Sequence, residues 1–115
     1  MKIRGATTEA MFQEYLRCYR DAATRHAICE EYRAAATIDL VHDAQDADAR
    51  ITAPLLALWG ARATVGALYD VVETWREKAL DVRGRAFDCG HSLQEEQPDE
   101  FFAEVSAFLV ESARP

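Results

Sequence analysis

A short apolar run, Leu55–Trp59, constrains the fold of this chain most, and Gly60 closes it. A run without polar alternation predicts a strand that is covered on both faces, as in a parallel sheet. One helical pattern follows from Thr64 to Ala79, and a weaker strand pattern spans Val82 to Asp88. A strand, a helix and a second strand in this order predict a right-handed parallel crossover and the α/β fold class.

The remaining patterns are mainly helical. Residues 8–21 and a segment from Thr24 to Ala35 carry apolar side chains at three- and four-residue steps, and the second pattern can continue through Val41. A polar segment that ends in Pro54 predicts a connection, and Pro98 suits the first turn of a final helix. The core face expected for that helix consists of Phe101, Phe102, Val105, Phe108 and Leu109.

The size and charge of the chain narrow the possible partners. The chain has 115 residues, which predicts one structural unit. Its net charge of −7 argues against nucleic acid and anionic membranes as partners, because phosphate groups need a basic face. No apolar stretch approaches the run of about 20 residues that spans a bilayer. We therefore expect no membrane segment.

The cysteines are few and dispersed. Cys18, Cys29 and Cys89 form no Cys-x-x-Cys pair, and His26 and His42 share no ligand spacing with each other. This pattern predicts reduced thiols in a cytoplasmic protein, with no metal site and no cofactor. The N-terminus has no apolar core of a signal peptide, which agrees with a cytoplasmic location.

Three segments together resemble a known family. They are Cys29–Ala34 with the nearby Asp39 and His42-Asp43, then Pro54–Gly60, and then Gly90–Glu96 with Pro98 behind it. Their order and gaps resemble the C-terminal part of haloacetate dehalogenases, which are α/β-hydrolases related to epoxide hydrolases. The last two segments identify only an α/β-hydrolase, whereas the first points to the dehalogenase branch.

The resemblance implies a fold and a division of the chain. It implies the C-terminal part of an α/β-hydrolase fold, in which two cap-like helices precede a β-α-β-α unit with parallel strands. Residues 1–46 would be the cap-derived helices and residues 47–115 the C-terminal part of the hydrolase core, joined in one structural unit.

The resemblance also implies a reaction and its residues. In the family, a nucleophilic aspartate attacks the carbon that bears the halogen, and a histidine-activated water hydrolyses the resulting ester. His91 matches that catalytic histidine, and Gly90 would allow the tight turn before it. Tyr32 matches a cap tyrosine that helps to hold the halide. Its position on an apolar helix stripe equally suits core packing, and for the isolated chain we prefer packing.

Several catalytic parts of the family are missing from this sequence. It contains no Gly-x-Asp-x-Gly or Gly-x-Ser-x-Gly elbow and no His-Gly oxyanion segment. Many α/β-hydrolases carry the third triad member directly after the Leu-Trp-Gly strand, but the segment Ala61–Gly66 contains no acid. The resembling dehalogenases place that acid after an earlier strand. We read Asp70 as a surface residue of a helix and Glu95-Glu96 as a solvated turn.

These observations leave three hypotheses. The first is a truncated dehalogenase-like hydrolase that is inactive alone and would take a small haloacid only when completed by the missing segments. The second is a binding or assembly module that forms a homodimer or joins a chain with the missing N-terminal strands. The third is a small independent enzyme that would use His91 with a local acid, although nothing in the sequence supplies its nucleophile, since Ser92 adjoins His91 and Cys89 lies two residues before it. The third ranks last, because such close neighbours of His91 rarely turn their side chains toward it.

Overall fold

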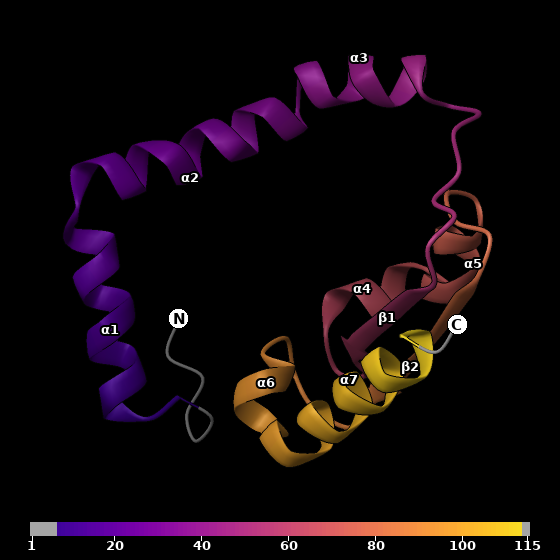
Figure 1. Cartoon of the computed structure of the whole chain (residues 1–115). Coiled ribbons are helices and arrows are strands. Elements are labelled where there is room, and N and C mark those ends of the chain that lie inside the picture. The colour runs from indigo at the N-terminus through magenta and orange to yellow at the C-terminus, as the bar shows by residue number, and fades with distance from the viewer. Residues whose placement is uncertain (1–6, 114–115) are drawn as a thin grey trace. The chain divides into compact units, whose positions relative to one another are not determined.

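The computed structural model describes residues 7–113 and comprises two compact units, Met1–Ala49 and Arg50–Pro115 (Figure 1). This division lies close to the boundary between the expected ranges 1–46 and 47–115. Residues 1–6 of the first expected range and residues 114–115 of the second lie outside the described residues.

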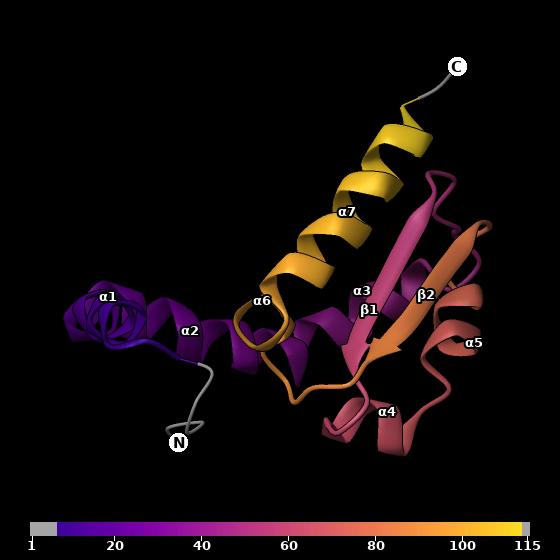
Figure 2. The same ribbon diagram turned by 90° about the horizontal axis from the view of Figure 1, so that it is seen from below.

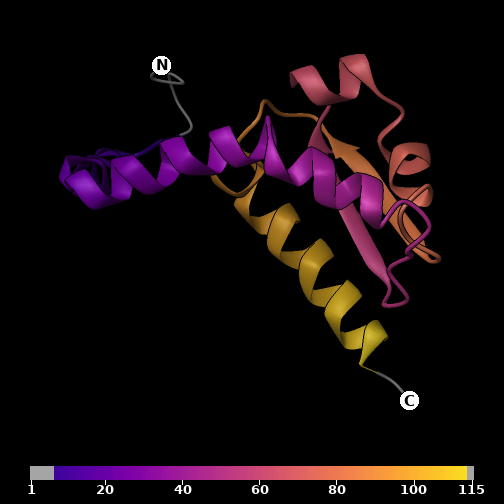
Figure 3. The same cartoon turned by 90° about the horizontal axis from the view of Figure 1, so that it is seen from above.

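The first unit consists of α1 (Glu9–Arg20), α2 (Ala22–Ala35) and α3 (Ile38–Gln45), which follow one another in Figures 1 and 3. The Asp21 carboxylate accepts the N–H of Ala23 at 3.0 Å and caps α2. The expected continuation of this helix through Val41 is wrong. The Thr37 hydroxyl donates to the carbonyl of Arg33 at 2.7 Å, and such local bonding by threonine competes with helical continuation.

The two units differ in how many of their side chains are buried. None of the described residues 7–49 is buried, although α1, α2 and α3 all carry large apolar side chains. Within the second unit, the buried apolar residues are Ala57, Val71, Ala79, Val82, Phe87, Cys89 and Leu93. The helices of the first unit therefore form no hydrophobic core among themselves. The only core of the described chain lies in the second unit.

The second unit is built on two parallel strands, β1 (Leu55–Gly60) and β2 (Val82–Phe87) (Figure 2). Leu55 pairs with Val82, and the register continues to the pair of Gly60 with Phe87. This parallel pair confirms the α/β class that the apolar run predicted. The strands are close enough that a β-carbon on Gly84 would lie 2.3 Å from the carbonyl oxygen of Ala57.

Two short helices connect the strands where the sequence predicts one. They are α4 (Thr64–Leu68) and α5 (Val71–Arg76). Asp70 is exposed, as expected of a surface residue, but its place within a helix is wrong, because its carboxylate accepts the N–H of Glu73 at 3.1 Å and starts α5 as a cap. Asp70 is thus an N-cap and not a residue within a helix.

The chain after β2 forms α6 (Leu93–Glu96) and α7 (Pro98–Ser112). Figures 1 and 2 show α7 on one side of the strand pair and α5 on the other. Arg85 of β2 binds Glu100 and Glu104 of α7 at 2.8 Å each, which ties the helix to the strand.

The core face expected for α7 is correct only in part. Phe101 and Phe108 are half-buried, whereas Phe102 is 73% exposed and Leu109 is 59% exposed. The helix packs only through the side that carries Phe101 and Phe108. No part of the described chain covers Phe102 and Leu109. No helix within residues 7–113 is long and apolar enough to cross a membrane.

Candidate functional site

The loop that carries His91 begins where β2 ends. Because both strands are parallel, their carboxyl ends meet at the same edge of the sheet. Two backbone bonds join the chain that leaves β1 to the chain that leaves β2. Ala61 donates to the carbonyl of Phe87 at 2.7 Å, and Arg62 donates to the carbonyl of Cys89 at 3.0 Å. The loop therefore extends the strand pairing beyond the sheet.

Two glycines lie at this close pairing. A β-carbon on Gly60 would lie 1.7 Å from the carbonyl oxygen of Gly90, which no real side chain could tolerate. A β-carbon on Gly90 would in turn lie 2.7 Å from a carboxylate oxygen of Glu96. The backbone contact therefore requires glycine at position 60, whereas at Gly90 a β-carbon would meet only the end of the Glu96 side chain.

The Glu96 carboxylate binds the backbone on both sides of His91. One oxygen accepts the N–H of Gly90 at 2.7 Å, and the other accepts the N–H of Ser92 at 3.3 Å. The interpretation of Glu96 as part of a solvated turn is wrong, since it is half-buried and ends the short helix α6. A capping-box pattern would have pointed from Ser92 to Glu95, so sequence reasoning misses the residue that makes the contact.

The His91 side chain itself is exposed. Within residues 7–113, the imidazole forms no hydrogen bond or ion pair with an acid. Before the loop, Arg62 forms an ion pair with Asp88, whose side chain is 90% exposed. The described chain thus presents a base at the sheet edge and pairs it with neither a nucleophile nor an orienting acid.

Tyr32 lies on α2, in the other compact unit. It is 76% exposed and lines a shallow hollow of about 290 Å³ with Glu31 and Ala35. The preferred interpretation of Tyr32 as core packing is wrong for the described chain, because α2 buries none of its residues. Since Tyr32 and His91 belong to different units, the structure does not define a site that they share.

The thiol closest to His91 is poorly suited to nucleophilic attack. Cys89 is 0% exposed, and its Sγ lies 3.5 Å from the carbonyl oxygen of Gly90. Burial raises the pKa of the Cys89 thiol, and the negative charge of Glu96 adds to this effect. Because the thiolate is the reactive form, these surroundings weigh against the hypothesis of an independent cysteine enzyme.

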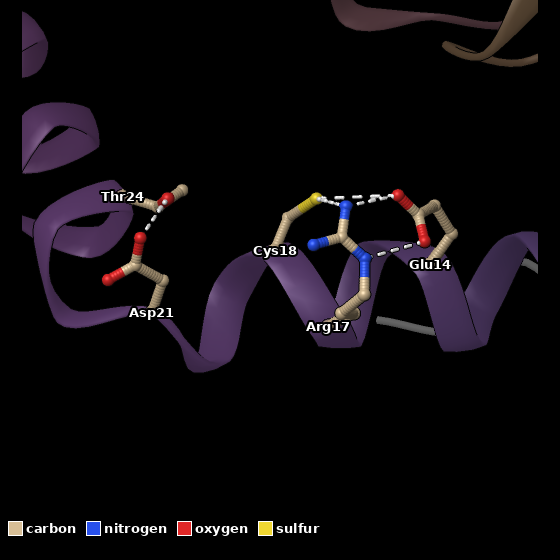
Figure 4. Close-up of polar contacts among 5 residues, drawn as sticks. All are labelled: Glu14, Arg17, Cys18, Asp21 and Thr24. Atoms are coloured by element: carbon tan, nitrogen blue, oxygen red, sulfur yellow. Dashed lines mark hydrogen bonds and ion pairs between the residues drawn. The ribbon is translucent and has the colours of Figure 1, made fainter.

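A second polar cluster lies on α1, but it is exposed (Figure 4). Arg17 donates to both carboxylate oxygens of Glu14, and Cys18 lies 3.8 Å from the same carboxylate. The hydrogen bond from Arg17 holds the pKa of Glu14 below its usual value. Arg17 and Glu14 thus form an ordinary exposed ion pair between residues one turn apart on the same helix. Within residues 7–113, no group of side chains could hold a metal ion.

Comparison with known proteins gives no match to a family model. A curated relative, the fluoroacetate dehalogenase of a Burkholderia species, is 27% identical over 100 residues, which span 87% of this chain and 33% of that protein. The chain therefore spans about a third of the length of this relative.

Solved structures match more closely. A Salmonella enterica protein assigned as an acyltransferase is 58% identical with a TM-score of 0.90, and the match covers 96% of this chain and 37% of that one. A Nostoc protein assigned as an α/β-hydrolase is 47% identical with a TM-score of 0.88, over 94% of this chain and 37% of that one. A Pseudomonas aeruginosa protein assigned as an epoxide hydrolase is 34% identical with a TM-score of 0.84, over 95% and 37%. The fold is common to all three, whereas the assigned reactions differ.

Proposed function

Because this chain has the fold of the C-terminal part of α/β-hydrolases of the haloacetate dehalogenase type, we propose that it supplies the hydrolytic base of such an enzyme. His91 is that base, and the nucleophile and the orienting acid come from segments beyond this sequence. The observation that carries the proposal is the exposed imidazole at the carboxyl edge of the parallel strands, where a substrate ester would lie.

The proposed reaction has two steps. An aspartate supplied by the completing segments attacks the halogen-bearing carbon of a small haloacid, and the carbon–halogen bond breaks with release of halide. His91 then takes a proton from water, and the resulting hydroxide attacks the ester carbonyl. The acyl carbon–oxygen bond of the ester breaks, the hydroxy acid leaves and the aspartate carboxylate is restored, and His91 becomes neutral again by giving its proton to solvent. Tyr32, whose hydroxyl is a hydrogen-bond donor, would help to hold the departing halide.

The role of His91 is tested by complementation. A second chain that carries the missing strands and a Gly-x-Asp-x-Gly elbow is combined with the wild-type chain or with His91→Ala, and fluoroacetate is added. If His91 is the base, the His91→Ala pair forms the ester but does not hydrolyse it, so the intact mass of the partner rises by one carboxymethyl group. The matched control is His26→Ala, an exposed α2 histidine, which should turn over normally.

The result that contradicts this role is equally clear. If the His91→Ala pair assembles and turns over fluoroacetate as fast as the wild-type pair, His91 is not the base. Assembly is measured separately by light scattering, so a failure to assemble is not mistaken for a failure of chemistry.

A second function, assembly with another chain, is favoured by the absence of buried residues in the first unit. None of residues 7–49 is buried, and within the described chain β1 pairs with β2 alone. Unpaired strand edges and uncovered apolar stripes are common sites of association. A homodimer would bury the same patch on both copies, and a chain with the missing strands would add them beside β1.

A further inference from the structure

We infer that Glu96 is the positioning residue of the His91 loop, an inference that deepens the proposed function and rests on His91 being the base. Glu96 does not touch a substrate. It fixes the backbone from which the imidazole projects, through the N–H groups of Gly90 and Ser92.

The geometry of the contact supports a clamp and not a single cap. The two carboxylate oxygens bind two different N–H groups, at 2.7 and 3.3 Å, and His91 lies between the two donors in sequence. These N–H groups belong to the Cys89–Gly90 and His91–Ser92 peptide groups, so fixing both limits the backbone rotations of Gly90 and His91 that would move the imidazole. Hydrogen bonds to an ionised carboxylate are also stronger than neutral ones.

The surroundings of Glu96 fit this role. Gly90 has no side chain, and any β-carbon there would meet the carboxylate at 2.7 Å. Leu93, which begins the same short helix, is buried against Phe87 and Cys89 and anchors α6 to the core. The clamp is therefore attached to the most buried part of the unit, whereas the imidazole that it positions is exposed.

A carboxylate is better suited to this position than an amide. Glutamine has the same length but only one acceptor oxygen, so it can keep one of the two bonds, and its NH₂ group then faces the other N–H. Glu96→Gln should release one loop amide, and Glu96→Ala should release both. This graded response distinguishes a clamp from a residue that only supports the fold.

The test uses nuclear magnetic resonance of the whole chain. In Glu96→Ala, the amides of Gly90 and Ser92 should exchange with solvent on the order of 10- to 100-fold faster, and in Glu96→Gln only one of them should do so. The control Asp99→Asn removes a carboxylate charge from the first turn of α7 and should leave both amides unchanged. Unchanged exchange of both amides in a folded Glu96→Ala or Glu96→Gln protein overturns the inference.

A kinetic arm separates this inference from the proposed function. In the complemented enzyme, Glu96→Gln should slow ester hydrolysis and leave ester formation unchanged, as His91→Ala does but to a smaller degree. If ester formation slows to the same extent, the clamp does not act through His91. If the amides respond as expected but His91→Ala leaves turnover intact, the clamp stands as a contact and the proposed function fails.

Discussion

The carbonyl oxygen of Gly90 occupies the place where a side chain on Gly60 would begin, since a β-carbon built there lies only 1.7 Å away. The end of β1 and the loop after β2 therefore meet backbone to backbone. This contact places His91 next to the carboxyl ends of both strands, independently of any residue outside Arg50–Pro115.

Gly60→Ala should displace this loop. The new methyl group meets backbone atoms, which cannot move aside as a flexible side chain can, so we expect a loss of at least about 2 kcal/mol in the free energy of unfolding. Gly66→Ala is the matched comparison, because its β-carbon would meet side-chain atoms of Trp59 at 2.8 Å and not the backbone. Urea unfolding measures the stability of both variants. An equal or smaller loss of stability for Gly60→Ala than for Gly66→Ala would contradict the close backbone contact between Gly60 and Gly90.

The chain alone should not release fluoride or chloride from haloacetates, because its sequence has no nucleophile elbow. An ion-selective electrode measures the release from fluoroacetate and chloroacetate. Release by the purified chain that disappears in His91→Ala would disprove the need for further strands. A background that His91→Ala does not change is attributed to contamination and counts as no release.

The chain alone should self-associate at low micromolar concentration. The helices α1, α2 and α3 bury none of their side chains, so association would remove apolar surface from water. Light scattering should give the mass of a dimer, and Tyr15→Glu with Tyr19→Glu should shift it toward the monomer, since both tyrosines are exposed on α1. A monomer mass for the wild type, with cooperative unfolding, would remove the case for assembly.

Cys89 should resist alkylation and should make the fold sensitive to alkaline pH. Iodoacetamide should modify the exposed Cys29 first and reach Cys89 only after unfolding, as mass spectrometry of the digested protein would show. Burial raises the pKa of the Cys89 thiol above its usual value of about 9, so the folded chain keeps a proton that the unfolded chain loses. Stability is therefore full below about pH 9 and falls as pH rises further.

The control for this pH dependence is Cys89→Ala. It should lower the stability at neutral pH because it opens a small cavity, but it should flatten the decline above pH 9. An equally steep decline in Cys89→Ala would assign the alkaline sensitivity to other groups.

Long patterns in the sequence predicted the fold well. The apolar run at 55–59 and the proline at the start of α7 identified a strand and a helix in their correct places. The breaks between helices were missed because they depend on single contacts. Asp70 caps α5 and Thr37 bonds back to Arg33, and the apolar periodicity continues through both positions.

The site was predictable only as far as its motif. The Gly-His segment predicted His91 as a candidate, but the contact of Glu96 with the loop depends on how α6 turns back toward it, which neither charge nor spacing revealed. The expected face of α7 failed for a different reason. Apolar spacing shows which residues need cover, and Phe102 remains exposed because the described chain has nothing that covers it.

The contacts that shape the His91 loop all join residues between Gly60 and Glu96. The stretch needs β1 for its strand pairing, so a piece that keeps the geometry of the loop must begin before β1. A split reporter cut before Arg50 would keep every contact described for the loop on one of its pieces, so under the proposed role of His91 its signal would depend on bringing the nucleophile to that loop.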